Sequence, residues 1–242
     1  MIKITNIKVY NFENAIRGMR NPFESFDKSD SFVTPLNCYN LNCPDVYESA
    51  TGFCKYCIDN NLASSSVDIN NVFVIGNNDM ELALKLVKAG AEHRKFLRQI
   101  FVSMDITAPL YWWKECDQYR IGVTTNSTST MHTLHKKFLT IDDFSFDDKE
   151  DPHVLDLIEY LNTLINDYNH YKKLGYENLA QEKWRKLIQL LPSSYNQTRT
   201  WTANYEVLRN IYHQRKNHKL VEWKEFCNVL EELPYSIFVT IK

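Results

Sequence analysis

Apolar and polar residues alternate in two stretches of the chain, and each stretch predicts a β-strand. The first covers residues 2–12, and the second covers residues 100–106, where an aliphatic side chain occupies every second position. A period of two places successive side chains on opposite faces of a sheet. A shorter apolar run over residues 72–75 marks the return of order after a long polar segment.

Elsewhere apolar residues recur at every third or fourth position, which predicts amphipathic helices. The clearest stripes consist of Val154, Leu157, Ile158, Leu161, Leu164 and Ile165, and then of Trp184, Leu187, Ile188 and Leu191. Two more helices are expected over about 202–216 and 219–233. Shorter helices are predicted over residues 13–20, from the capping residues 76–79 to Gly90, and from Pro109 towards Tyr119. The helix that follows residue 79 would carry Leu82, Leu86 and Val87 on one face.

These elements predict an α/β (α+β) fold. We expect a central, mostly antiparallel sheet flanked by helices, with a helical C-terminal half. The 242 residues suffice for a single domain, 1–242, with a sizeable core. Residues 24–70 are interpreted as a Cys-rich insertion within it, because the stretch over residues 24–66 is polar and ends in three consecutive serines.

Four of the six cysteines lie in that insertion, as Cys38, Cys43, Cys54 and Cys57. Two close pairs of thiolates can complete a tetrahedral structural zinc site, and metal binding would supply folding energy to a polar segment. Unliganded thiols are the main alternative, and a redox role for the pair Cys54 and Cys57 is a third. The sequence leaves these three interpretations open.

Composition narrows the class of protein. The formal net charge is −2, so bulk attraction to nucleic acid or to an anionic membrane is not indicated. No stretch approaches the roughly 20 apolar residues that span a bilayer. The first four residues, Met1 to Ile4, lack the charged and apolar pattern of a secretory signal. We therefore expect a cytoplasmic protein.

The segment from Leu191 to Glu222 is the most informative for chemistry. On the predicted helix, Asn204 and Arg215 share one face with Leu208 and Ile211, so an amide would begin this face and a guanidinium would end it. A guanidinium binds a phosphate or a pyrimidine carbonyl edge with paired donors. Spacing alone favours a surface arginine that stabilises a helix C-terminus.

A second candidate lies between Gly122 and Thr130, where nearly every residue carries a hydroxyl or an amide. Such a loop can direct several donors at a phosphate, although it can also be a solvated turn. Glu115 and Gln118 precede it, one helical turn apart, so both can line a pocket or form an exposed polar face.

These residues resemble the flavin-dependent thymidylate synthases. Leu191-Pro192, then Trp201-Thr202-Ala203-Asn204, then Arg215 match a Leu-Pro, a W-T-x-N segment and an arginine eleven residues after the asparagine. Gln118-Tyr119-Arg120-Ile121 is similar to the stretch that carries the R-H-R signature of the family. The segment that begins Ala91-Glu92-His93 resembles a family segment that contains a histidine and, further on, a Glu-His pair. His93 matches the histidine, and Arg98 and Gln99 replace the Glu-His pair. Glu206 and Asn210 occupy positions of an arginine and a histidine. The resemblance covers residues 1–23 and about 72–233.

The resemblance implies FAD as cofactor and the conversion of dUMP to dTMP, with NADPH and methylene-tetrahydrofolate as co-substrates. It implies a homotetramer that combines residues from several subunits. Arg215 would bind dUMP and polarise the uracil. The other substrate contacts would come from Glu115, Gln118, Asn126, Ser127, Thr128 and Ser129. The flavin contacts would come from His93, Tyr119, Arg120, Ile121, Asn204 and Asn210. Two alternatives remain: another flavin-dependent C5 modification of dUMP or dCMP, and a catalytically silent nucleotide-binding module.

Overall fold

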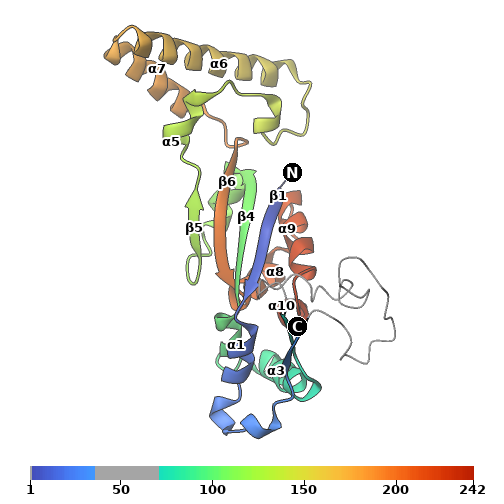
Figure 1. Ribbon diagram of the computed structural model, residues 1–242. Helices are drawn as coiled ribbons and strands as arrows, with labels where there is room; N and C mark the ends of the chain where they lie inside the picture. The colour runs from blue at the N-terminus through green and yellow to red at the C-terminus, as the bar shows by residue number, and fades with distance from the viewer. Residues whose placement is uncertain (1, 36–70) are drawn as a thin grey trace. The chain divides into compact units, whose positions relative to one another are not determined.

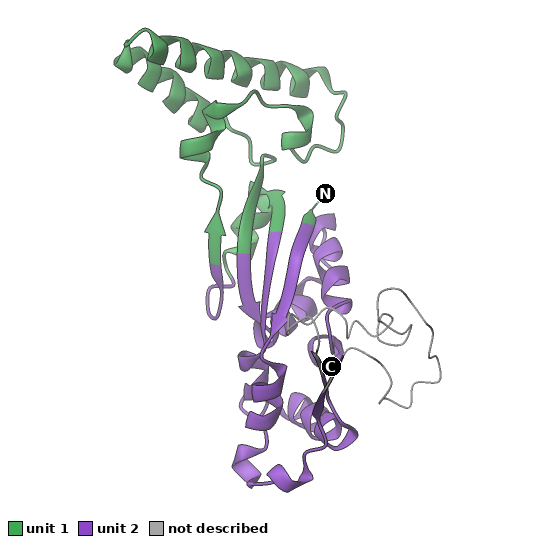
Figure 2. Cartoon of the chain, in the orientation of Figure 1, with its two compact units in different colours: residues 1–3, 106–118, 125–200 green, residues 4–105, 119–124, 201–242 purple. Residues whose placement is uncertain are grey.

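The computed structural model describes residues 2–35 and 71–242 (Figure 1). These residues form two compact units (Figure 2). Unit 1 consists of residues 1–3, 106–118 and 125–200, and unit 2 of residues 4–105, 119–124 and 201–242. No helix within 2–35 and 71–242 is both long enough and apolar enough to cross a bilayer.

The strands of the described residues are β1 (Lys3–Tyr10), β2 (Phe32–Pro35), β3 (Asn71–Val74), β4 (Phe101–Pro109), β5 (Thr124–Ser127) and β6 (Asn196–Asn204). The α-helices are α1 (Phe12–Gly18), α3 (Asn77–Ala89), α4 (Leu110–Cys116), α5 (Thr130–Thr133), α6 (Pro152–Lys173), α7 (Glu177–Leu190), α8 (Tyr205–Arg215), α9 (Val221–Glu231) and α10 (Ile237–Thr240). Short 3-10 turns are η1 (Asn21–Phe23), η2 (Phe26–Lys28), η5 (Lys95–Gln99), η6 (Leu134–Lys136) and η7 (Ile141–Asp143).

The main sheet is antiparallel and has the strand order β1-β4-β6-β5. A second sheet pairs β2 with β3 in antiparallel register, with Phe32 opposite Val74. The alternation predicted around residue 100 is confirmed in β4, because Val102, Met104 and Ile106 are all buried while the side chains between them are more exposed. The predicted α/β fold with an antiparallel sheet and flanking helices is therefore confirmed.

One predicted boundary is wrong. The helix expected from residue 202 begins at Tyr205, and the preceding residues belong to β6. Trp201 and Ala203 are buried and Thr202 between them is not, so this segment follows the period of a strand. Asn204 is extended, with φ −118° and ψ 166°, and caps α8. It therefore stands before the helix and does not share a helical face with Arg215.

Unit 1 is built around the hairpin of α6 and α7, and both predicted stripes contribute to its core. Asp151 caps α6 by accepting a hydrogen bond from the backbone N–H of His153, and Gly175, at φ +77°, lies in the turn between the helices. The stripe residues pack against side chains from the loops before α6. The buried cluster consists of Leu134, Leu139, Phe144, Ile158, Leu161, Leu164, Ile165 and Leu187.

In unit 2, large aromatic side chains pack the end of β6 against α9. Trp201 of β6 meets Phe226 of α9 edge to face at 6.0 Å, and Phe226 meets Trp223 in the same way at 5.9 Å. The Tyr205 hydroxyl at the start of α8 donates to the carbonyl of Pro234. The Tyr205 contact holds the start of α8, which carries most of the candidate site.

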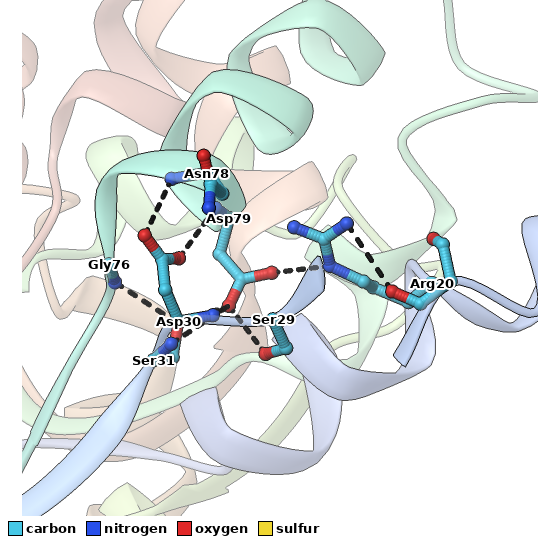
Figure 3. Close-up of polar contacts among 8 residues, drawn as sticks. Arg20, Ser29, Asp30, Ser31, Gly76, Asn78 and Asp79 are labelled. Carbon is cyan, nitrogen blue, oxygen red and sulfur yellow. Dashed lines mark hydrogen bonds and ion pairs between the residues drawn. The ribbon is translucent and has the colours of Figure 1, made fainter. Parts of the chain in front are cut away.

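A buried carboxylate joins α3 to the segment before β2 (Figure 3). Asp79 is fully buried and accepts hydrogen bonds from Arg20 Nε at 2.6 Å, from Ser29 Oγ at 2.7 Å, and from the backbone N–H and hydroxyl of Ser31. Asp30 returns the contact by accepting from the backbone N–H groups of Asn78 and Asp79 itself. Residues 24–35 of the predicted insertion thus include a stretch bound to the first turn of α3.

The expected helix up to Gly90 is confirmed, but its predicted buried face is only partly correct. Asp79, Ala83 and Val87 are buried, whereas Leu82 and Leu86 are half-buried. The face is rotated because the hydrogen-bonded Asp79 carboxylate is turned inwards. A prediction based on apolar residues alone does not place an acidic residue such as Asp79 on the buried face of a helix.

Candidate active site

A cavity of about 530 Å³ lies in unit 2 around the first turns of α8. Its lining comprises Arg94, Arg98, Ile121, Gly122, Asn204, Glu206, Val207, Arg209, Asn210 and His213. Three of the predicted flavin contacts, Ile121, Asn204 and Asn210, are therefore brought together. Ile121 lies in the loop after α4, Asn204 is the N-cap of α8, and Asn210 lies within α8.

Asn204 organises one edge of this cavity. Its Oδ1 accepts a hydrogen bond from the backbone N–H of Val207 at 3.0 Å, which caps α8. Gly122 lies against the same side chain, at φ +77°, and a Cβ at this position would stand 2.8 Å from Asn204 Nδ2. Only glycine combines this backbone conformation with this close approach. The sequence offered Gly122 as a signal, next to the predicted Ile121, but its role comes from the fold.

An ion pair crosses the wall of the cavity. Arg94 Nε lies 2.8 Å from Oε2 of Glu206, and Arg94 Nη2 lies 3.0 Å from Oε1, so the contact is bidentate. The two side chains are 21% and 18% exposed, and both remain accessible from the cavity. A guanidinium and a carboxylate in this geometry hold each other in a fixed plane.

Arg209 and His213 form the inner part of the wall. Arg209 Nη1 donates to carbonyls at the end of α10, including those of Phe238 and Val239 at 3.4 Å. Burial and the charge of Arg94 lower the pKa of Arg209, against the opposing effect of Glu206. Burial and then the charge of Arg209 lower the pKa of His213, which leaves its imidazole neutral at pH 7. The cavity therefore presents guanidinium groups with a single carboxylate among them.

This cationic lining was not predicted from the sequence. Glu206, Arg209 and His213 are spaced three and four residues apart, which is the spacing of one helical face and could have been noticed. Arg94 and Arg98 share the same spacing in the segment before β4. Their convergence on the same cavity depends on the packing of η5 against α8.

Arg215 ends α8, and its guanidinium is held by aromatic residues. Its Nε donates to the Tyr119 hydroxyl at 2.9 Å. Its Cζ lies 4.9 Å from the ring centre of Trp223 and 5.7 Å from that of Tyr119. Tyr119, a predicted flavin contact, thus lies beside the predicted substrate arginine.

The remaining predicted substrate residues lie in unit 1. Glu115 is half-buried in α4, whereas Gln118 is exposed just beyond that helix. Asn126 and Ser127 are exposed in β5. Thr128 donates through its N–H and its hydroxyl to the carbonyl of Thr198. Ser129 precedes α5, as its N-cap. Their roles towards a substrate stay predictions.

His93 lines a second cavity of unit 2, of about 600 Å³, together with Met19, Phe23 and Phe96. Its side chain is half exposed, with Nε2 3.5 Å from Glu92. Arg120 is exposed in the turn after α4. The flavin contacts predicted for His93 and Arg120 also stay predictions. Cys38, Cys43, Cys54 and Cys57 lie outside the described residues.

Comparison with known proteins identifies the family. Residues 46–237 match the family model described as thymidylate synthase complementing protein, and this match includes the later part of the predicted insertion. A crystal structure of thymidylate synthase X from Helicobacter pylori with FAD and dUMP has a TM-score of 0.61 at 16% identity, covering 98% of this chain and 94% of that chain.

A second structure, of the flavin-dependent thymidylate synthase from Helicobacter pylori complexed with FAD and dUMP, has a TM-score of 0.60 at 15% identity and covers 98% of both chains. No curated protein sequence matches the chain. At these identities the likeness to solved structures establishes the fold, and the family model covers well over half of the sequence. The chain therefore belongs to the thymidylate synthase complementing protein family and is an enzyme of the flavin-dependent thymidylate synthase kind.

Proposed function

We propose that this chain methylates dUMP to dTMP with FAD as cofactor, methylene-tetrahydrofolate as one-carbon donor and NADPH as reductant. The observation that carries the proposal is the cavity at the start of α8, which gathers Ile121, Asn204 and Asn210 in a chain of this family. Arg215 lies at the other end of the same helix. One helix thus carries both a candidate cofactor wall and a candidate substrate group.

The residues of the cavity fit a flavin dinucleotide. Arg94, Arg98 and Arg209 offer guanidinium groups of the kind that bind a pyrophosphate. Asn204 and Asn210 offer carboxamides, which match the donor and acceptor edges of a flavin ring. Gly122 keeps the backbone close to Asn204, so this edge has no room for a larger side chain. When bound, the flavin supplies the redox chemistry, while the protein binds and orients.

Arg215 is the residue that we assign to the pyrimidine. Its planar guanidinium can pair with a carbonyl edge or a phosphate, and as a permanent cation it stabilises negative charge that develops on the uracil ring. It touches the substrate in this proposal and is therefore its catalytic residue. The hydroxyl-rich loop from Asn126 to Ser129 is proposed to bind the phosphate of dUMP.

The proposal needs no protein nucleophile. The two cysteines within the described residues, Cys116 and Cys227, are both buried. Burial raises the pKa of the Cys227 thiol to about 12, so it is a thiol at neutral pH. We further propose a cytoplasmic homotetramer, and a structural zinc ion held by Cys38, Cys43, Cys54 and Cys57.

A second candidate function is another flavin-dependent C5 modification of dUMP or dCMP. Gln118 and Tyr119 stand in place of the first two residues of the R-H-R signature, and Glu206 stands in place of an arginine and is bound by Arg94. These differences concern residues around the reacting groups. They would alter which reaction follows binding more than they would alter binding itself.

The flavin spectrum of the purified full-length protein tests both candidates. We expect absorbance at about 450 nm, either as purified or after addition of FAD. A colourless protein that takes up no FAD would contradict both. Release of tritium from C5-labelled dUMP, followed by identification of the product, then separates methylation from another C5 modification.

Arg215→Ala tests the assignment of the substrate group. We expect dUMP binding to weaken about 100-fold, because a charged, paired contact to the pyrimidine is lost. Arg185→Ala is the matched control, since Arg185 is an exposed arginine of α7. Equal dUMP affinity in the two variants would show that Arg215 is not the substrate group. Retained 450 nm absorbance would show that the loss is specific to the substrate.

A further inference from the structure

The guanidinium of Arg215 is fixed by contacts that the proposed reaction does not itself require. We propose that Tyr119 is a positioning residue that holds Arg215 in the orientation that binds the pyrimidine. This inference rests on the proposed function, because it concerns how the substrate group is presented. It differs from the sequence prediction, which placed Tyr119 against the flavin.

A hydrogen bond from the backbone-side nitrogen of the guanidinium sets its orientation. Arg215 Nε donates to the Tyr119 hydroxyl at 2.9 Å. Because Nε is the inner nitrogen of the fork, a partner there sets the rotation of the whole plane. The two Nη atoms then form the outer edge of the fork, which is the edge that pairs with planar carbonyl or phosphate groups.

Two aromatic rings contact the guanidinium of Arg215. Trp223 of α9 is fully buried, and its ring centre lies 4.9 Å from Arg215 Cζ. Tyr119 and Trp223 meet at 6.1 Å with an angle of 72° between their rings. Two aromatic rings at this angle contact the guanidinium from two directions, within the range of a cation–π interaction. The position of the cation is thereby restrained as well as its rotation.

The hydroxyl of Tyr119 makes a second hydrogen bond in addition to the one with Arg215. Tyr119 Oη donates to Oε1 of Gln214 at 2.9 Å, so its proton points away from Arg215 and its lone pair faces Nε. Gln214 Nε2 in turn donates to Oδ1 of Asn210 at 2.7 Å. A chain of three hydrogen bonds thus runs from Arg215 to a residue that lines the cavity.

The energetic consequence is preorganisation. A free arginine side chain loses rotamer entropy when it binds a ligand. Here Tyr119 and Trp223 restrict the side chain before the substrate arrives, so less entropy is lost at binding. The same restraint keeps the charge where it acts on the pyrimidine, which matters because small displacements cost large factors in rate.

The test measures dUMP binding to the full-length, flavin-loaded protein by titration calorimetry. Tyr119→Phe keeps the ring and removes the hydroxyl, and we expect dUMP affinity to fall about five- to tenfold. Gln214→Met, a change at an exposed position that does not threaten the fold, is expected to cost about twofold. Tyr212→Phe is the matched control, because it removes a hydroxyl of α8 that binds Glu231 and not Arg215. Its dUMP affinity should equal that of the wild type.

A double-mutant cycle separates positioning from a general structural effect. In an Arg215→Lys background the Nε–H donor to Tyr119 is absent, so Tyr119→Phe should cause no further loss of affinity. A loss equally large in that background would overturn the inference, as would unchanged affinity of Tyr119→Phe alone. Failure of the wild type to bind dUMP at all would instead overturn the proposed function, and the inference with it.

Discussion

Two arginine–carboxylate pairs of unit 2 have the same chemistry and different surroundings. Arg20 and Asp79 are 5% and 0% exposed, and the carboxylate accepts further hydrogen bonds from Ser29, Ser31 and the backbone (Figure 3). Arg94 and Glu206 are each about one-fifth exposed and line a cavity with other cationic groups. The first carboxylate is fully satisfied within the protein, whereas the second faces a space that a ligand can enter.

The difference shows what each pair does. A buried carboxylate surrounded by donors holds chain segments together, since Asp79 of α3 is bound both by Arg20 and by Ser29 and Ser31 of the segment before β2. At the cavity wall, excess positive charge surrounds the pair of Arg94 and Glu206. The carboxylate of such a pair is suited to hold a guanidinium in place for an anionic ligand. We therefore assign the Asp79 pair to stability and the Glu206 pair to binding.

The largest expected effect is on stability at Asp79. Asp79→Asn leaves Arg20 buried without a counter-charge, and removing one partner of a buried ion pair costs about 3–5 kcal/mol. Urea unfolding measured by circular dichroism would show this loss, with Asp27→Asn, a change of an exposed neighbour, as control. A loss of less than about 1 kcal/mol would mean that the two pairs do not differ as we infer.

An intermediate effect is expected at Arg94. Arg94→Gln should cost about 1 kcal/mol of stability, because the pair is partly solvated. It should weaken FAD binding about tenfold, since the Glu206 carboxylate then faces the cavity without its partner. Flavin fluorescence during titration measures this affinity.

The double variant Arg94→Gln/Glu206→Gln sharpens the test at Arg94. It removes the uncompensated negative charge and should recover part of the FAD affinity. If Arg94→Gln destabilises the protein as strongly as Asp79→Asn, the pair is structural after all. If the double variant binds FAD no better than Arg94→Gln, then repulsion by Glu206 is not the cause of the weaker binding.

The smallest expected effect is on the pH dependence of stability, which should differ between the region of Asp79 and the region of His213. Burial raises the pKa of Asp79, but hydrogen bonds from Ser31, Ser29 and Arg20 outweigh it, so the folded pKa lies below the ordinary 3.8. This contribution is complete above about pH 3.8 and is lost as the pH falls through the folded pKa. The lowered pKa of His213 has the same sign, so its contribution is complete above about pH 6.5 and declines below that value.

Unfolding curves at several pH values should separate the two regions. His213→Gln should reduce the pH dependence just below pH 6.5, and Asp79→Asn should reduce it only below pH 3.8. A change of the same size in both ranges for either variant would contradict the separation.

Several parts of the fold could be predicted because their patterns are local. The alternation in β4 and the stripes in α6 and α7 each follow from one element that buries one face. The boundary at Asn204 could not be placed, since Thr202 and Ala203 fit a strand or a helix equally well in isolation. Asp79 was missed as a core residue because its burial depends on donors nearly 50 residues away.

The candidate site divides in the same way. Asn204 and Arg215 could be singled out from residue types and from a spacing that the family shares, but their placement on one helical face was wrong, because Asn204 ends β6 and caps α8. Their roles towards flavin and substrate stay predictions. The cationic wall of Arg94, Arg98 and Arg209 depends on the packing of η5 and α10 against α8. The spacing of residues along one helix cannot predict which other elements pack against it.

The sequence by itself indicated the family through a resemblance, predicted the antiparallel α/β fold and singled out Arg215 as a candidate substrate group, because hydrophobic period and short-range spacing are properties of single segments. Only the tertiary structure decided that Tyr119 and Trp223 hold Arg215, that Glu206 is bound by Arg94, and that Gly122 lies against Asn204. These contacts join residues up to 112 positions apart. Their geometry comes from the packing of elements, which no local pattern contains.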